Sequence, residues 1–351
     1  METTATPPVR ARQKVTPDKI MKVGMGFWAS KILLTAVNIG LFTRLGRGPA
    51  DATKLKTKLD LHERSTLDFL DSLVALGFIK RKGVGWDAVY SNAEDTDLFL
   101  DKNKSTYMGG ILEMSNNRLY PFWNDLESAL KSGKPQNEAK DGDKPFFGQI
   151  AGDEQKLREF VQAMGGVQVG NFFQFSKEFD FSKYETLCDI GGAGAHLATQ
   201  VATNQPHMSC ISFDLPEVTK IAQENIERMD FSPRVKAVAG DMFEVDFPKA
   251  DVITMGNLLH DWGIEDRKKL IKKAYDALPD GGALVVIENI IDDERRLNAF
   301  GLMMSLNMLI ETHEGADFTG AEFESWAIGA GFKKTALMPL NGPASAVIAY
   351  K

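Results

Sequence analysis

From about residue 185 to its end, the chain alternates between short apolar runs and longer segments with helical periodicity. The runs are TLCDI, SCISFDL, RVKAVAG, ADVITMGNLL and ALVVIENI, and helical patterns such as IEDRKKLIKKAYDAL separate them. Such alternation predicts a parallel sheet wrapped by helices on both faces. The last two runs, FKKTALMPL and SAVIAYK, are joined by NGPA and predict a terminal antiparallel hairpin.

The first part of the chain has a different hydrophobic periodicity. Residues 18–130 carry apolar side chains at helical spacing, which predicts one helix over 27–45 and another that begins behind Ser65 and ends at Gly77. The segment FIKRKGVGWDAVYSN then predicts a hairpin. Helix, helix and hairpin in this order outline a winged helix, a fold that often binds DNA.

The charges argue against DNA. The helix that would enter the groove carries Glu63, Asp68 and Asp71 against Arg64, and the whole chain has 41 basic and 48 acidic side chains. Acidic helices are repelled by phosphates, so we expect no nucleic-acid partner and a winged-helix-like scaffold used for protein contact. The apolar helix over 27–45 is a candidate dimer surface, although internal core explains its periodicity almost as well.

The length of 351 residues favours two domains, and the cysteines indicate the compartment. Cys188 and Cys210 both fall inside apolar runs, as buried thiols in a reducing compartment do. The N-terminal segment is polar and lacks the apolar stretch of a signal peptide, and ILLTAVNIGLF is too short to span a bilayer. We therefore expect a cytoplasmic protein with no membrane partner.

Ligands of open α/β sheets bind beyond the carboxyl ends of the strands. The first strand there runs into Gly191 and Gly192, whose missing side chains let backbone approach a ligand closely. The second strand ends at Asp214, which suits a ribose diol, and the third is followed by Asp241 and Met242, which suit an adenine. The glycines do not fit G-x-G-x-x-G, so these positions predict a nucleoside site without a pyrophosphate clamp.

The fourth and fifth strands end in ionisable groups. His260 follows an apolar strand at the edge where the site should lie, which favours a general base over a structural histidine. Glu288 at the end of the next strand can bond an imidazole and select its tautomer, although a solvated strand-end acid explains it equally well.

Seven motifs in order carry a family resemblance. DIGGAG, FDLPEV, GDMFE, LLHDW, ALPDGG, IEN and GAGF resemble the S-adenosylmethionine-dependent small-molecule O-methyltransferases, which include plant caffeate, acetylserotonin, and bacterial hydroxyneurosporene and phenazine enzymes. The resemblance spans residues 18–351. It implies an α/β fold in which a C-terminal Rossmann-like class I methyltransferase domain, with a mostly parallel seven-stranded sheet, follows a mainly helical, winged-helix-like dimerisation domain. The expected divisions are a flexible arm at 1–17, the helical domain at 18–170 and the catalytic domain at 171–351.

The resemblance also implies roles for individual residues. His260 would deprotonate the acceptor hydroxyl, with Glu288 and Asp317 orienting it, the latter standing where the family usually has a longer Glu. S-adenosylmethionine would lie against Gly191, Gly192, Asp214, Leu215, Asp241, Met242 and Trp262. The acceptor, a phenolic, quinone-like or polyketide-like molecule, would contact Phe147, Phe160, Met164, Asn257, Met304 and Met308. No metal is expected, and the enzyme would be a homodimer.

Three other hypotheses are weighed against this one. The first is a relative that keeps the fold but acts as a cyclase, decarboxylase or hydroxylase, because Ala193 and Ala195 replace glycines common in the family and disfavour positive φ. The second is a winged-helix DNA-binding regulator, which the acidic helix opposes. The third, a nicotinamide dehydrogenase, is excluded by the missing third glycine of its fingerprint.

Overall fold

The computed structural model describes residues 15–104, 106–140 and 152–351. The chain divides into two compact units, residues 1–105 and 106–351, and each is described by itself. The domain boundaries expected at residues 17 and 170 stay predictions, and residues 106–170 lie in the larger unit.

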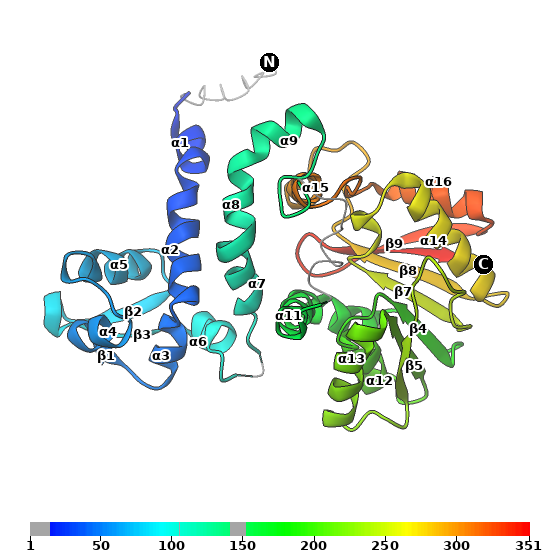
Figure 1. The fold of residues 1–351 in the computed structure, drawn as a ribbon, viewed down its shortest axis with the longest axis horizontal. Helices are drawn as coiled ribbons and strands as arrows, with labels where there is room; N and C mark the ends of the chain where they lie inside the picture. The colour runs from blue at the N-terminus through cyan, green and yellow to red at the C-terminus, as the bar shows by residue number, and fades with distance from the viewer. Residues whose placement is uncertain (1–14, 105, 141–151) are drawn as a thin grey trace, which may run out of the picture. The chain divides into compact units, whose positions relative to one another are not determined.

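The first unit is mainly helical (Figure 1). Its elements are α1 (Asp18–Gly24), α2 (Gly26–Asn38), α3 (Leu41–Gly46), β1 (Ala50–Asp51), α4 (Ala52–Lys58), α5 (Glu63–Ala75), β2 (Ile79–Lys82), η1 (Gly85–Asp87), β3 (Val89–Asn92) and α6 (Glu94–Leu100). Strands β2 and β3 pair antiparallel, which confirms the predicted hairpin, and β1 adds to β3. Leu70 and Leu73 of α5 are fully buried, so the periodic face of that helix forms the core of the unit.

Two expectations for this unit are wrong in detail. The single helix over 27–45 is broken into α2 and α3, because Gly40 adopts a left-handed φ of 74°, which ends a helix. Helix α5 begins three residues earlier than expected: His62, not Ser65, is its cap, and the His62 ring nitrogen Nδ1 accepts from the Arg64 amide at 3.1 Å. The predicted end of the helix is confirmed, with Gly77 at a φ of 86°.

Helices α1 and α2 form an exposed apolar segment. By length and composition alone the run Asp18–Asn38 could cross a membrane; it is longer than ILLTAVNIGLF, the apolar run considered in the sequence, and only overlaps it. Core helices and signal sequences pass the same test, and only 17% of this segment is buried. Ile20, Val23, Phe27 and Trp28 are among its exposed side chains, which marks the segment as a contact surface.

The second unit contains a seven-stranded sheet in the order β6-β5-β4-β7-β8-β10-β9. The strands are β4 (Thr186–Ile190), β5 (Ser209–Asp214), β6 (Val235–Ala239), β7 (Val252–Gly256), β8 (Ala283–Glu288), β9 (Lys334–Pro339) and β10 (Ser345–Tyr350). The first five in spatial order are parallel, and β10 runs antiparallel to both β8 and β9. This confirms the predicted class I methyltransferase sheet and its terminal hairpin.

Helices cover both faces of this sheet (Figure 1). The helices after residue 150 are α11 (Glu154–Glu178), α12 (His196–Asn204), α13 (Pro216–Arg228), η4 (Leu259–Asp261), α14 (Ile264–Ala277), α15 (Ala299–Glu311) and α16 (Gly320–Ala330). One core cluster joins the sheet to α11, α12 and α13, and a second joins it to α14 and α16. Adjacent residues of β4, Leu187 and Cys188, enter opposite clusters, as the alternation along a strand requires.

Before the sheet, the second unit has short helices: α7 (Gly109–Met114), the π-helical turn η2 (Ser115–Leu119), α8 (Tyr120–Phe122), η3 (Trp123–Asp125) and α9 (Leu126–Ser132). They are tied to α15 by side chains. The Trp123 indole donates to Asn307 Oδ1 at 2.9 Å, and Arg118 pairs with Glu311. Helix α15 is thereby held between these helices and the carboxyl ends of the strands.

Candidate active site

The glycine turn after β4 is built around close backbone contacts. A Cβ added to Gly192 would lie 2.3 Å from Ser212 Oγ, and one added to Gly191 would lie 2.9 Å from a Leu258 methyl. Gly191 has a φ of 69°, and the turn continues through Ala193 at 45° and Ala195 at 62°. Both alanines therefore adopt the left-handed conformation that a Cβ disfavours.

Asp214 closes this turn from the neighbouring strand. Its Oδ2 accepts from the Ala193 amide at 2.9 Å, and its Oδ1 accepts from the Leu215 amide at 2.7 Å. Burial raises the pKa of the Asp214 carboxyl to about 6, although the two amide bonds oppose the rise. The structure thus brings together Gly191, Gly192, Asp214 and Leu215, four residues singled out from the sequence.

The segment after β6 carries the remaining cofactor candidates. Asp241 is exposed, and its Oδ1 accepts from the Phe243 amide at 2.8 Å. Phe243 packs edge-on against Trp262 with 4.6 Å between ring centroids, and Met242 joins the same core cluster. Met242 and Trp262, which are distant in the sequence, therefore belong to one apolar wall.

His260 lies in the turn η4 beyond the carboxyl end of β7 and is only 5% exposed. Its Nδ1 is 3.3 Å from Glu288 Oε2 and 3.5 Å from Asp317 Oδ1, and its Nε2 is 3.5 Å from Asp261 Oδ1. The three residues expected to form a base and its orienting acids are thus neighbours. Asp261 is a fourth member that the sequence reasoning did not single out, although it stands in the same HDW motif.

The charges of this cluster are coupled. Burial alone would lower the pKa of His260, but Glu288, Asp261 and Asp317 outweigh it and raise that pKa to about 10. Burial raises the pKa of Glu288 to about 7 and that of Asp261 to about 6. The buried imidazole and its carboxylates therefore hold a shared proton near neutral pH.

Glu288 also fixes the backbone of the His260 turn. Its Oε1 accepts from the amides of Leu258 and Leu259, each at 3.0 Å. One carboxylate oxygen thus anchors the turn while the other faces the imidazole. This double role removes the alternative of a solvated strand-end acid, because the side chain is 1% exposed.

The segment that carries Asp317 packs closely on the same turn. A Cβ on Gly315 would lie 2.6 Å from the His260 carbonyl oxygen, so only glycine fits there. The Asp317 amide donates to Ser305 Oγ of α15 at 3.2 Å. The shorter carboxylate of Asp317 still reaches the imidazole, because its own backbone is held close to the His260 turn.

Four of the residues expected to contact the acceptor lie on two helices, α11 and α15. Phe160 of α11 packs against the buried cluster that contains Val161 and Val218, and Ala193 of the glycine turn packs against the same cluster. Met164 lies one turn further along α11. Met304 and Met308 belong to α15, which packs against η4. Phe147 lies outside the described residues.

Asn257 is in a special backbone position. It has a left-handed φ of 46°, its amide donates to the Ile287 carbonyl at 3.0 Å, and its buried Oδ1 has no partner among the described residues. The buried indole nitrogen of Trp262 is likewise without a partner in the described part of the chain. Two polar atoms at this edge of the sheet are therefore ready to bond a ligand.

Arg267 is a buried residue that the sequence reasoning missed. It is 3% exposed, and its Nε donates to the carbonyls of Leu259 at 2.9 Å and Trp262 at 2.8 Å. The signal was present in the sequence: position 267 falls on the same periodic face of α14 as Leu270, Ile271 and Ala274, which is the buried face. A charged residue on an apolar helix face requires buried partners.

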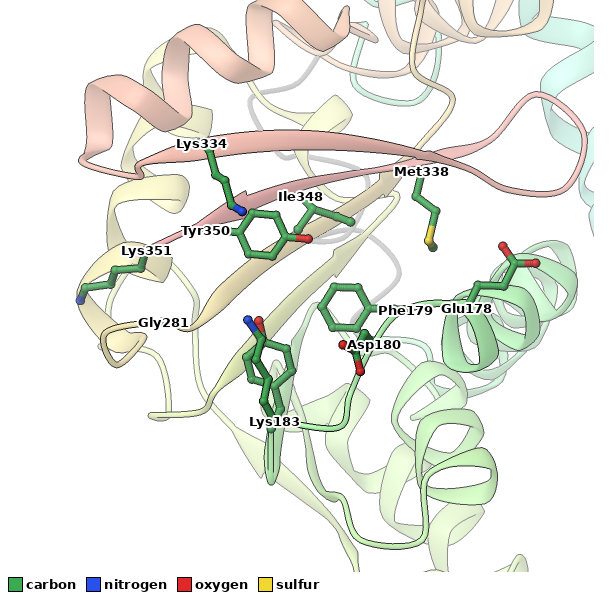
Figure 2. Close-up of a pocket in the computed structure, with 11 residues that line it drawn as sticks. Glu178, Phe179, Asp180, Lys183, Gly281, Lys334, Met338, Ile348, Tyr350 and Lys351 are labelled. Atoms are coloured by element: carbon green, nitrogen blue, oxygen red, sulfur yellow. The ribbon is translucent and has the colours of Figure 1, made fainter.

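A cavity of about 440 Å³ lies elsewhere (Figure 2). Its lining includes Tyr184 just before β4, Gly281 just before β8 and Tyr350 at the end of the antiparallel β10. These positions mark the amino edge of the parallel strands, opposite the edge that carries the glycine turn and His260. The cavity is therefore distinct from the candidate active site.

His260, Glu288 and Asp317 also meet the geometric requirement of a metal site, since one ligand atom from each lies within 4.8 Å of the others. A base with two orienting carboxylates has the same residue types and spacing. The expectation of a metal-independent enzyme stays a prediction.

Comparison with known proteins decides the family. Residues 123–333 match the model of an O-methyltransferase domain, and residues 21–102 match that of an O-methyltransferase dimerisation domain. The chain belongs to the O-methyltransferase family. The exposed apolar helices α1 and α2 fall largely inside the dimerisation match, which supports a homodimer formed through this unit.

Similar proteins cover the chain almost end to end. The tetracenomycin polyketide synthesis 8-O-methyl transferase of Streptomyces glaucescens is 36% identical over 95% of this chain and 97% of its own. Human N-acetylserotonin methyltransferase, solved with S-adenosylmethionine, superposes with a TM-score of 0.88 at 26% identity, covering 97% of this chain and 99% of that one. The structure titled PigF with SAH gives 0.84 at 25% identity, covering 96% and 100%.

This O-methyltransferase is therefore an S-adenosylmethionine-dependent enzyme with a small-molecule acceptor. The predicted family, fold class and cofactor are confirmed. The hypothesis of a DNA-binding regulator loses its support, because the matched family is one of methyltransferases. A non-methylating relative would belong to the same family, but the similar proteins named above are methyltransferases.

Proposed function

We propose that this O-methyltransferase methylates a hydroxyl of an aromatic, polyketide-like small molecule, a phenol or a quinone-related compound, with His260 as the general base. One observation carries the proposal: a buried histidine at the carboxyl edge of the sheet has its Nδ1 3.3 Å from the buried carboxylate of Glu288. The acceptor class is supported by relatives named for polyketide and naphthoate methylation, the latter 27% identical over 95% of this chain.

The residues at the strand ends fit the cofactor. A Cβ on Gly192 would collide with Ser212 Oγ, so glycine is what allows the turn to close tightly under the proposed cofactor. The Asp214 carboxylate retains lone pairs for a ribose diol beyond its two amide bonds. Met242 and Trp262 form an apolar wall suited to an adenine, with Asp241 exposed beside it. Bound S-adenosylmethionine supplies a methyl group made electrophilic by its sulfonium.

His260 is proposed to take the acceptor proton on Nε2. Glu288 and Asp317 both face Nδ1, whereas Asp261 alone faces Nε2, so the two acids together favour the tautomer that carries its proton on Nδ1 and leaves the Nε2 lone pair available. The same carboxylates stabilise the imidazolium that forms as the oxygen attacks. A phenol has a pKa of about 10, so an imidazole whose pKa is raised toward that value is well matched to share the proton.

The acceptor is proposed to lie between the two groups of apolar side chains described above. Phe160 and Met164 would contribute from α11, and Met304 and Met308 from α15. Flexible methionines adapt to a flat aromatic ligand. Asn257, with its unpaired Oδ1, would bond a polar group of the acceptor. We also propose a cytoplasmic enzyme without a membrane partner, supported by its two buried free thiols.

Turnover with a panel of acceptors tests this proposal. Purified dimer is incubated with S-adenosylmethionine and hydroxylated naphthoates, anthraquinones and an aryl amine, and S-adenosylhomocysteine and methylated products are quantified. We expect one methyl ether per S-adenosylhomocysteine with a naphthol or anthraquinone. Methylation of the amine alone, or of no aromatic hydroxyl, would contradict the proposal.

A further inference from the structure

Two segments of the site meet at the Arg267 guanidinium of α14. Its Nε donates to the Leu259 carbonyl at 2.9 Å and to the Trp262 carbonyl at 2.8 Å, which are the residues on either side of His260 and Asp261. Its Nη2 donates to the carbonyl of Ala316, the residue just before Asp317. One side chain thus joins the turn that carries the imidazole to the segment that carries one of its carboxylates.

The guanidinium is held from its other sides as well. Its carbon lies 5.3 Å from the Phe318 ring centroid and 5.5 Å from that of Trp326. Arginine suits this place because its planar group can donate several bonds in one plane while its faces contact aromatic rings. Methionine or lysine fills a similar volume but cannot reproduce both features.

Arg267 also contributes a positive charge among several carboxylates. The carboxylates that favour its charge come from every element around it: Glu288 from β8, Asp317 from the segment before α16, Glu322 from α16 and Asp261 from η4. Three of these four, all except Glu322, are the acids that face His260. A buried positive charge here offsets negative charge that would otherwise hold a proton on the imidazole.

We propose that Arg267 is the positioning residue of the His260 site, which bridges the imidazole turn to the Asp317 segment and balances the buried carboxylates around the imidazole. The methyl-transfer role of this arrangement rests on the proposed function. The hydrogen bonds by which Arg267 bridges the two segments do not depend on the proposed function, because they belong to the folded chain.

The test compares Arg267→Met, which keeps the volume and removes charge and donors, with Arg267→Lys, which keeps the charge. Lys268→Met is the matched control, because Lys268 is the next residue of α14 and is exposed, with a surface ion pair to Glu265. For each full-length dimer, S-adenosylmethionine affinity is measured by calorimetry, and kcat and KM are measured with 3-hydroxy-2-naphthoate after treatment with a chelator.

In Arg267→Met we expect kcat at neutral pH to fall by at least about tenfold while S-adenosylmethionine affinity changes by less than about twofold. The acid limb of the kcat profile should move to higher pH, because removing a positive charge favours the imidazolium. Arg267→Lys should return the limb toward the wild-type pH, and Lys268→Met should match wild type. A fall in kcat that is equal at every pH, or that follows the cofactor affinity, would overturn the proposal.

A measurement without an acceptor separates this proposal from the proposed function. With ¹⁵N-labelled histidine, the His260 ring signals of the S-adenosylhomocysteine complex are assigned by their loss in His260→Gln and followed against pH. An upward shift of the His260 titration in Arg267→Met, but not in Lys268→Met, supports the bridge even if no aromatic hydroxyl is methylated. An unchanged titration in a folded Arg267→Met protein would overturn it.

Discussion

Nδ1 of His260 lies 3.3 Å from Oε2 of Glu288, and the other oxygen of that carboxylate accepts from the amides of Leu258 and Leu259. One buried acid therefore holds both the ring and the backbone of the proposed base. In the same way Asp214 holds the glycine turn through the Ala193 amide. Neighbouring strand ends are thus joined by carboxylate-to-amide bonds.

His260→Gln should lower kcat by about 100-fold to 10,000-fold, because the general base is lost while its volume is nearly kept. S-adenosylmethionine affinity, measured by calorimetry, should stay within about twofold, because the proposed role of His260 is toward the acceptor and not the cofactor. His207→Gln is the control, since His207 lies before β5 at the opposite edge of the sheet. Full activity in His260→Gln would show that His260 is not the general base.

Glu288→Gln should lower kcat by about 100-fold or more, because the new amide would donate toward Nδ1 and favour the wrong tautomer. The amide oxygen can still accept from Leu258 and Leu259, so the fold should persist. Asp317→Asn should have a smaller effect, since Asp317 lies 3.5 Å from Nδ1 and does not anchor the turn. Steady-state kinetics and circular dichroism of both variants check this order, which an equal loss in the two would contradict.

Activity should rise with pH through the alkaline range. A group raised to a pKa of about 10 is protonated at neutral pH, and only the unprotonated imidazole accepts the acceptor proton. The profile of kcat/KM is measured with two acceptors whose hydroxyl pKa values differ. The limb that belongs to His260 should stay at the same pH for both, whereas a limb that moves with the acceptor pKa would belong to the acceptor.

Ala193→Gly should raise the free energy of unfolding by roughly 0.5 to 1 kcal/mol, because glycine relieves the left-handed φ of 45° at some cost in unfolded-chain entropy. Ala195→Gly should be nearly neutral. Its φ is 62°, but its methyl is fully buried, and losing that methyl costs about 0.8 kcal/mol. Urea unfolding of both variants measures the difference, and a destabilised Ala193→Gly would refute the strain argument.

Chelation should leave the activity unchanged. His260, Glu288 and Asp317 are spaced as metal ligands are, but a base with its orienting acids needs no ion. Turnover is compared before and after dialysis against a chelator, with added Mg²⁺ and Zn²⁺ as separate conditions. A loss on dialysis that one of these ions restores would assign the cluster to a metal.

Local sequence patterns were sufficient for the strands and for the order of the motifs. The runs that became β4 to β8 were visible because buried parallel strands need continuous apolar stretches between turns. The same logic located Gly191, Asp214, His260 and Glu288, since strand ends of a parallel sheet meet at one edge. The helix over 27–45 was misjudged because apolar periodicity continues across Gly40, whose φ breaks the helix.

Only the tertiary structure decided which of these residues touch. Asp317 is brought to His260 by the packing of Gly315 on the imidazole turn, a contact between segments more than 50 residues apart that no local pattern encodes. Arg267 became significant only when its carbonyl partners were placed around it. Sequence determines where polar groups can stand along the chain, whereas burial, which depends on the whole fold, determines which partners they must find and how their pKa values shift.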